Sequence, residues 1–225
     1  GKRVLRLDLK SADGKAAFAS MIGAADVLME SYRPGVMAKL EFAPERLRGI
    51  NPGLVHCALS GYGQNGPLRL AGGHDINYAA AAGALGLTGP AEKPSMAFPP
   101  VADYAGALQS VIGILGALVR RGRGGEGAYL DIAMADCVLA WQSQALTAHR
   151  RSGDADAGKP ARGDNLLTGG AACYGVYQTQ DARFVSLGAI EETFWKNFCE
   201  TAGRADWIAR QFEPMPQTDL IADVA

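Results

Sequence analysis

One histidine stands where a glycine-containing turn meets the start of a predicted helix. The run from Gly72 to Tyr78 reads Gly-Gly-His-Asp-Ile-Asn-Tyr, and the helix is predicted over residues 75–87. The positive end of a helix dipole favours a neutral imidazole, which is the form that can accept a proton. The residues themselves leave two interpretations of His74 open: an acid–base group, or a helix-terminal histidine hydrogen-bonded to a carbonyl group.

Three carboxylates lie at the start of predicted helices. Asp103 precedes a helix predicted to run from Tyr104 to Arg120, where an aspartate is typical of an N-cap. Glu191 opens another predicted helix, where it would complement the helix dipole. Asp75 follows His74 directly and could cap its helix or orient the imidazole. Position alone does not separate structural from chemical roles for these side chains.

The composition excludes some classes of protein. Of 225 residues, 48% are apolar, and 22 Lys and Arg balance 23 Asp and Glu, so no strong positive field for nucleic acid is expected. The longest strongly apolar run, Val111–Val119, is shorter than the roughly 18 residues of a membrane span. The 4 cysteines form no C-x-x-C pair, so neither disulfides nor a metal site is predicted. We predict a soluble, cytoplasmic protein.

Strands and helices alternate through the first two thirds of the chain. The pattern predicts an α/β fold with a Rossmann-like large domain built on a parallel sheet. Strands are expected over residues 4–9, 25–30, 54–59 and 128–132, and helices over 11–23, 44–49, 75–87, 103–120 and 134–149. The glycine-rich loop 60–67 leaves the carboxyl end of a strand, the edge where such sheets bind ligands.

A second, smaller domain is predicted after residue 150. Residues 150–170 are rich in Gly, Asp and Pro and are expected to form a linker. Residues 171–190 alternate as a hairpin does, and a helix follows, so residues 171–225 are expected to form part of a small α+β domain. The large domain would comprise residues 1–149. The chain is expected to be a fragment truncated at both ends, because it starts directly in a predicted strand and stops without closing an element.

Short motifs along almost the whole chain make the sequence resemble the α-methylacyl-CoA racemases, a branch of the family III CoA-transferase superfamily. The most specific motif is Gly73–Tyr78, because transferases of the superfamily usually lack its histidine. The other motifs are Leu7–Lys10, Ser31–Val36, Ser60–Gln64, Ala102–Tyr104, Asp131–Met134 and Gly188–Glu191.

The resemblance implies an isomerase that epimerises (R)- and (S)-2-methylacyl-CoA by 1,1-proton transfer through an enolate. His74 and Asp103 would be the two proton carriers, and Glu191 would hydrogen-bond toward the histidine. Positioned proton transfer contributes about 10²–10⁴ in rate, so the enolate oxygen must also be stabilised. No metal and no cofactor beyond the CoA of the substrate is implied. Two chains would interlock as a homodimer.

The resemblance also assigns residues to the CoA part of the substrate. Arg33 and Lys39 would meet its phosphates, although solvated surface charges are the usual role of such side chains, and the family more often has arginine at position 39. The complete set implied is Leu7, Asp8, Leu9, Lys10, Ser31, Tyr32, Arg33, Lys39, Gly73, Asp75, Ile76, Asn77 and Tyr78. The large domain would thus bind CoA.

Two alternatives stay open. Asp136 matches the position whose carboxylate, in the true CoA transferases of the superfamily, attacks the acyl-CoA and forms a mixed anhydride. Racemases often keep an aspartate there, so Asp136 does not discriminate between the two activities. Family members are longer at both ends, which also allows a non-catalytic fragment that binds CoA or builds a dimer.

Overall fold

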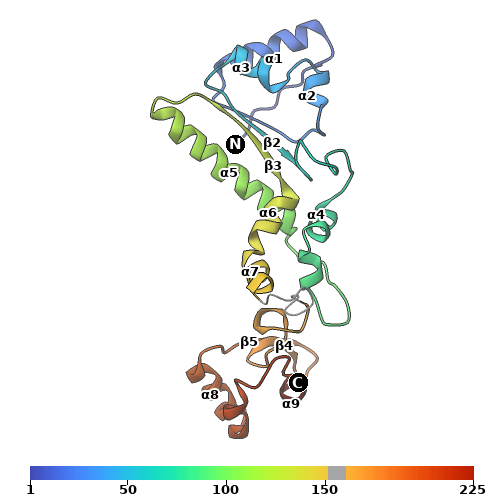
Figure 1. Cartoon of the computed structure of the whole chain (residues 1–225), viewed down its shortest axis with the longest axis vertical. Helices are drawn as coiled ribbons and strands as arrows, with labels where there is room; N and C mark the ends of the chain where they lie inside the picture. Colours follow the sequence, from blue (N-terminus) through green and yellow to red (C-terminus); the bar gives the residue numbers. More distant parts are fainter. Residues whose placement is uncertain (152–160) are drawn as a thin grey trace. The chain divides into compact units, whose positions relative to one another are not determined.

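The computed structural model describes residues 1–151 and 161–225, which divide into two compact units (Figure 1). Unit 1 comprises Gly1–Ala82 and Phe98–Trp141, and unit 2 comprises Gly83–Ala97 and Gln142–Ala225. Each unit has its own core and is described by itself.

Unit 1 is built on a three-stranded parallel sheet in the order β1-β2-β3. The strands are β1 (Val27–Glu30), β2 (Val55–Ser60) and β3 (Ala128–Ala133). Val55 of the central strand pairs with Val27 on one side and Ala128 on the other. The predicted parallel α/β sheet is therefore confirmed, and β2 is buried along most of its length, as its continuous apolar run predicts.

The strand predicted over residues 4–9 is wrong. That segment is irregular, with Val4 88% and Leu5 63% exposed, and it ends in a turn where the Ser11 N–H donates to the Asp8 carbonyl at 3.1 Å. An alternating pattern becomes a strand only where a neighbouring strand satisfies its backbone groups. In the described residues the sheet ends at β1 on one side and at β3 on the other.

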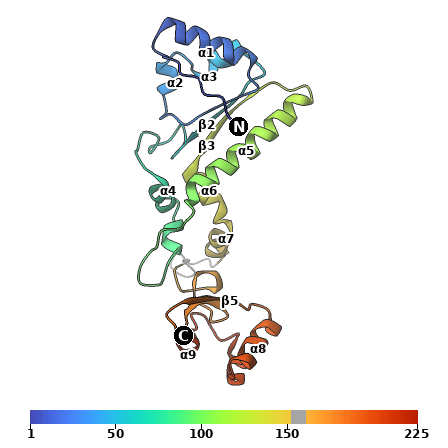
Figure 2. The ribbon, with the colours of Figure 1, turned by 180° about the vertical axis from the view of Figure 1, so that it is seen from behind.

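Two groups of helices accompany the sheet (Figure 2). The first group closes a core of Ile22, Met37, Phe42, Leu47 and Leu54, and its first helix is capped by the Ser11 hydroxyl, which accepts from the Gly14 N–H at 3.0 Å. It consists of α1 (Ala12–Ala24), α2 (Val36–Lys39) and α3 (Pro44–Ile50). The second group is α4 (Asp75–Ala81), α5 (Val101–Gly122) and α6 (Met134–Trp141), of which α5 packs on β2 and β3.

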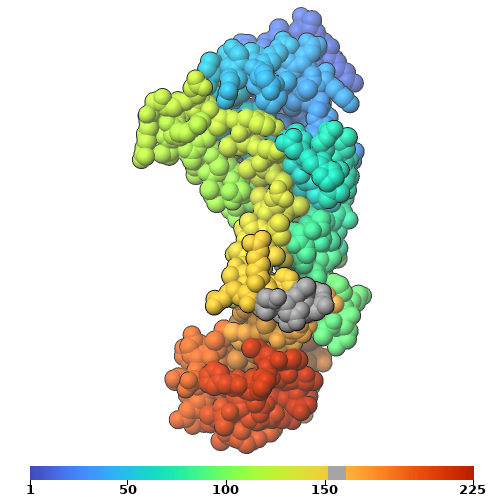
Figure 3. Space-filling view, viewed as in Figure 1, coloured from blue at the N-terminus to red at the C-terminus, as the bar shows by residue number. Residues whose placement is uncertain are grey.

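The two faces of α5 differ in their packing. Small residues, including Ala102, Ala105 and Gly106, are buried, whereas Ile112 is 62% and Leu115 57% exposed. Figure 3 shows the side chains of this helix at the molecular surface. Length and composition alone would also allow α5 to cross a membrane, since it has 22 residues and contains an 18-residue window with a mean hydropathy of 1.4. Its small-residue face packs on strands β2 and β3.

Unit 2 contains the predicted hairpin. Strands β4 (Tyr174–Gln178) and β5 (Phe184–Gly188) pair antiparallel, with Tyr174 opposite Gly188. The remaining elements are η1 (Ala84–Leu87), α7 (Ser143–Arg151), η2 (Leu166–Thr168), α8 (Glu192–Thr201), η3 (Ala205–Arg210) and α9 (Thr218–Val224). Trp195, Cys199, Trp207 and Leu220 form the centre of its core.

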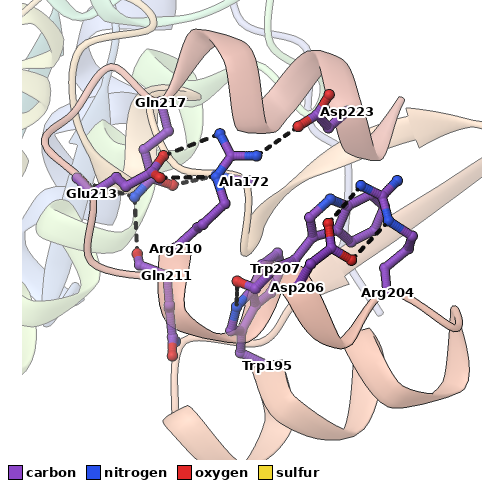
Figure 4. A network of polar contacts seen from close by, with 10 residues as sticks. All are labelled: Ala172, Trp195, Arg204, Asp206, Trp207, Arg210, Gln211, Glu213, Gln217 and Asp223. Carbon is purple, nitrogen blue, oxygen red and sulfur yellow. Dashed lines mark hydrogen bonds and ion pairs between the residues drawn. The ribbon is translucent and has the colours of Figure 1, made fainter.

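A buried glutamine connects several segments of unit 2 (Figure 4). The Gln217 side chain accepts from the Ala172 N–H at 3.0 Å and donates to the carbonyls of Gln211 and Glu213, each at 2.9 Å. Nearby, Trp195 Nε1 donates to the Trp207 carbonyl at 3.1 Å. These bonds satisfy polar groups in a core that would otherwise leave them without partners.

The observed units differ from the predicted domains 1–149 and 171–225. Residues 83–97 and α7 belong to unit 2, and the helix predicted over 134–149 is two helices separated at Gln142. The helix predicted over 75–87 is likewise two elements, α4 and η1, separated at Gly83 with φ of 85°. Of the predicted linker 150–170, residues 152–160 lie outside the described residues. The linker residues from 161 onward belong to unit 2, where Arg162 Nη1 donates to the Gly86 carbonyl at 2.8 Å.

Candidate functional site

His74 is the N-cap residue of α4, as the sequence predicts. Its backbone is extended, with φ of −130° and ψ of 178°, and its N–H donates to Asn77 Oδ1 at 3.1 Å. Its carbonyl accepts from the Asn77 and Tyr78 N–H groups at 2.8 and 3.2 Å. The side chain is exposed. The helix start therefore fixes the backbone of His74 and leaves the imidazole at the surface.

Tyr78 fixes the turn that precedes His74. Its ring packs against two glycines, because a Cβ at Gly61 would lie 2.2 Å, and one at Gly73 2.8 Å, from Tyr78 Cε1. Its hydroxyl donates to the Gly73 carbonyl at 2.5 Å, and its ring meets Tyr62 edge-on at 5.1 Å. Tyr78, which the resemblance places among the residues that bind CoA, is buried between two loops in this structure.

The electrostatic surroundings of Tyr78 connect it with two other candidate residues. Burial is the largest cause that raises the pKa of the Tyr78 hydroxyl, and the charges of Tyr62 and Asp103 raise that pKa further. The positive charge of Arg33 lowers it. Asp103 and Arg33 thus act on the same buried phenol, which lies one helical turn after His74.

Asp75 connects α4 with α5. Its Oδ1 accepts from the Ala102 N–H at 2.5 Å and from the Asp103 N–H at 3.1 Å, across 27 and 28 residues of sequence. The residue at the N-cap of α5 is Pro100, whose side chain makes no capping hydrogen bond. The interpretation of Asp103 as an N-cap is therefore wrong: α5 begins at Val101, Asp103 lies in its first turn, and Asp75 supplies the cap.

This contact brings the segments of His74 and Asp103 together. His74 directly precedes Asp75 in the chain, and the Asp103 N–H donates a hydrogen bond to the Asp75 carboxylate. The side chains of His74 and Asp103 are both exposed. The sequence did not predict the contact, because its partners are far apart in the chain.

Arg33 lies against the glycine turn before His74. The position that a Cβ would take at Gly72 is 3.2 Å from Arg33 Nη2. Arg33 follows β1, and the glycine-rich loop follows β2, so both lie at the carboxyl edge of the parallel sheet, where α/β proteins bind ligands. Lys39 lies in the last turn of α2, and its side chain is exposed.

The sequence interpretation missed Asp131 as a residue that holds the glycine-rich loop. The Gln64 N–H donates to Asp131 Oδ1 and Oδ2 at 3.1 and 3.0 Å. Gly63 has φ of 81°, a conformation that favours glycine, and a Cβ there would be 3.6 Å from Asp131 Oδ1. The available signal was a carboxylate in a strand that follows the glycine-rich loop in the chain and was predicted to lie in the same sheet.

The other candidate CoA contacts lie on loops of unit 1 and in the first turn of α4. Leu7, Asp8, Leu9 and Lys10 form the turn before α1, in which Asp8 Oδ1 accepts from the Lys10 N–H at 2.9 Å. Ser31 and Tyr32 follow β1, and the Tyr32 N–H donates to Glu30 Oε2 at 2.7 Å. Ile76 is in the first turn of α4 and 38% exposed.

Asp136 lines a cavity in unit 1. The cavity has a volume of about 330 Å³, and its walls include Tyr62, Asn65, Pro67 and Leu139. Asp136 itself is exposed in the first turn of α6. It also acts on its neighbour: burial, together with the charge of Asp136, raises the pKa of the Cys137 thiol.

Glu191 belongs to unit 2. It is the N-cap residue of α8, its side chain is exposed, and its carboxylate makes no capping hydrogen bond. Across residues 1–151 and 161–225, no three His, Cys, Asp or Glu side chains gather in a way that could hold a metal ion.

Known proteins resemble the chain along most of its length. Residues 1–221 match the family model described as CoA-transferase family III. An alpha-methylacyl-CoA racemase from Mus musculus is 41% identical over 205 residues, which cover 87% of this chain and 51% of the relative. An acetyl-CoA:oxalate CoA-transferase from Acetobacter aceti is 36% identical over 205 residues, covering 90% and 51%. The chain spans about half the length of these curated relatives.

A solved structure has the same fold. A CAIB/BAIF family protein from Brucella suis superimposes with a TM-score of 0.79 at 24% identity, covering 100% of this chain and 64% of its own. Likeness at that identity shows the fold alone, and it agrees with the predicted mixture of a parallel sheet and helices.

Proposed function

Because this chain belongs to CoA-transferase family III, we propose that it acts on CoA thioesters and racemises 2-methylacyl-CoA at the carbon next to the thioester. Relatives at similar identity include both a racemase and a CoA-transferase, so the proposal depends on the site. The observation that carries it is the Asp75 carboxylate, which holds the first turn of α5 against the start of α4 and so brings the segments of His74 and Asp103 together.

The reaction needs a base on one face of the carbon and an acid on the other. Neutral His74 would take the α-proton, and the electron pair of the C–H bond would form the enolate. A protonated Asp103 would then give its proton to the opposite face, which leaves a charged imidazole and a carboxylate. The same pair works in reverse on the other enantiomer. Because both side chains are exposed, their protons would exchange with solvent between turnovers.

The CoA part of the substrate would lie along the carboxyl edge of the sheet. Arg33, beside the turn at Gly72, would meet a phosphate group, and a guanidinium can bind phosphate with two parallel hydrogen bonds. Lys39 would add charge without that geometry. The backbone of residues 7–10 and of residues 73–78 would line the remainder. From the resemblance we retain, as part of the proposal, a hydrogen bond from Glu191 of the small domain toward the catalytic histidine.

We further propose a cytoplasmic homodimer that needs no cofactor besides the CoA of its substrate, has no membrane-spanning segment and binds no nucleic acid. The near-neutral charge of −1 supports the last point. Sedimentation equilibrium tests the dimer: a mass of one chain over the whole micromolar range would contradict it.

Exchange of the α-proton with solvent deuterium tests the proposed activity. A single enantiomer of a 2-methylacyl-CoA is incubated with the protein in deuterated buffer and followed by NMR. We expect the α-proton signal to disappear and the other enantiomer to form. Substituting His74→Ala or Asp103→Asn should lower the rate of inversion by about 10²–10⁴. Asp136→Asn should leave it within a few-fold of wild type. Wild-type protein that exchanges no α-proton would refute the proposal.

The second candidate function is CoA transfer through Asp136. The cavity of about 330 Å³ beside this carboxylate favours it, because an acyl group needs space next to the nucleophile. Incubation with acyl-CoA and hydroxylamine tests it, since a mixed anhydride at Asp136 would be trapped as a hydroxamate and detected by mass spectrometry. A trapped adduct without α-proton exchange would favour transfer. Binding of CoA with neither signal would identify a non-catalytic chain.

A further inference from the structure

The first turn of α5 lacks a cap of its own. The leading N–H groups of a helix have no partner within the helix and need an acceptor from outside it. Here two of them, from Ala102 and Asp103, donate to Asp75 Oδ1 at 2.5 and 3.1 Å, while Pro100 offers no side-chain acceptor. The acceptor comes from the first residue of α4, directly after His74.

This carboxylate therefore joins two helix starts. Asp75 is half-buried, and the positive ends of both helix dipoles favour its negative charge. A carboxylate oxygen that already accepts two backbone hydrogen bonds has little capacity left for a substrate. These two bonds give the Asp75 side chain a role within the fold, which is compatible with the proposed contact between CoA and the backbone of residues 73–78.

We infer that Asp75 is a positioning residue that sets the place of Asp103 relative to His74. The inference rests on the proposed function, in which these two side chains serve opposite faces of one carbon. Because the backbone of His74 is held by Asn77, loss of the Asp75 carboxylate releases the start of α5 and leaves the start of α4 in place. A displacement of about 1 Å in a reacting group can lower a rate by about 10²-fold.

The two faces of the substrate give a readout that a loss of stability away from the start of α5 would not change. With the enantiomer whose proton His74 removes, Asp75→Ala should preserve exchange of the α-proton, because His74 can return a solvent deuteron to the same face. Inversion needs Asp103 and should fall about 10–100-fold. The ratio of exchange to inversion therefore rises by a similar factor. With the opposite enantiomer, both processes fall together.

Two variants serve as controls. Asp75→Asn keeps an oxygen at the Oδ1 position and should restore a ratio close to that of wild type. Asn51→Ala removes bonds to the Ile22 and Ala25 carbonyls, each 2.9 Å, elsewhere in unit 1. It should reduce stability without changing the ratio of exchange to inversion.

Hydrogen exchange of the backbone amides tests the contact independently of activity. Deuterium uptake in a peptide that covers residues 101–105 should rise in Asp75→Ala and not in Asn51→Ala. Unchanged uptake at this turn, or an unchanged ratio of exchange to inversion, would overturn the inference. If wild-type protein shows no α-proton exchange, the proposed function fails and the positioning role falls with it. Raised amide uptake would in that case still identify Asp75 as the cap of α5.

Discussion

Substitution of Gly61 by alanine should disturb the packing that holds the His74 turn in place. A Cβ at this position would lie 2.2, 2.5 and 2.8 Å from Tyr78 Cε1, Cζ and Oη, well inside ordinary van der Waals contact at about 3.5–4.0 Å. The ring has little freedom to retreat. It is 8% exposed, its hydroxyl is bonded to the Gly73 carbonyl, and its edge packs on Tyr62.

The size of the effect follows from the two ways in which the clash can be relieved. If the ring stays, the extra methyl group overpacks the site, which costs about 1–3 kcal/mol. If the ring swings out, the molecule loses a hydrogen bond of about 0.5–1.5 kcal/mol and an aromatic contact of about 0.5–1.5 kcal/mol. Both routes give a loss of about 1–3 kcal/mol in the free energy of unfolding of unit 1.

Amide hydrogen exchange at increasing urea, read on peptides from β2 and α4, measures the stability of unit 1 separately from unit 2. Gly116→Ala is the matched control, because a Cβ there meets nothing within 4 Å. Gly116 lies inside α5, so its substitution should stabilise the unit by about 0.5–1 kcal/mol.

A double-mutant cycle tests the assigned cause. In a Tyr78→Ala background the added methyl group has no ring to meet, so Gly61→Ala should cost close to zero. The interaction energy of the cycle should then account for nearly the whole loss. An equal loss with and without the Tyr78 ring would refute the reasoning.

Three further predictions concern unit 2. Gln217→Ala leaves the Ala172 N–H without its partner, which should lower the free energy of unfolding of unit 2 by about 1–3 kcal/mol. Tryptophan fluorescence in a Trp141→Phe background measures this loss. Burial raises the pKa of Tyr177 to about 12, against ~10 in the unfolded chain. The contribution of this buried phenol to stability is therefore complete below pH ~10 and is lost as the pH rises toward 12. Tyr177→Phe should remove one late step from the absorbance titration at alkaline pH and delay alkaline unfolding. Cys199 is 0% exposed, and burial raises the pKa of its thiol. Alkylation of this thiol at pH 8 should therefore occur only on unfolding. Fast labelling of Cys199 in the native protein would contradict this packing.

Local signals were sufficient to predict most elements of unit 1. Ser11 caps α1 and Pro44 opens α3 through interactions that involve only nearby residues, so their types and positions indicate the helix starts directly. The continuous apolar run of β2 likewise predicts a strand buried on both faces. The segment 4–9 carries a similar signal, but a strand also needs a neighbour, and the pattern of one segment does not report where its neighbours are.

Helix interruptions were partly visible in the sequence. Gly83, with φ of 85°, ends the helix that begins at Asp75, and a glycine within a helical pattern is a recognised sign of such an end. The interruption at Gln142 has no comparable marker, because the residues on both sides favour a helix. The hairpin of unit 2 was predictable because alternation and turn residues coincide.

The site shows the clearest limit of reasoning from sequence. His74 could be placed at a helix start from the residues around it, since its backbone contacts reach no further than Tyr78. Asp103 was placed as a cap because aspartate is common there, yet a carboxylate 28 residues away occupies that role. Capping preferences describe what a helix start requires and not which segment supplies it.

The two proposed proton carriers therefore depend on the fold in different ways. His74 is fixed by contacts within its own helix start and by the ring of Tyr78, which bonds to the adjacent turn. Asp103 has its place set by a single carboxylate from another helix, through bonds that disappear together if α5 shifts. Mild denaturant or heat should consequently impair protonation by Asp103 before it impairs proton removal by His74. In a two-base racemisation that order predicts a range of conditions in which exchange of the α-proton continues after inversion has stopped.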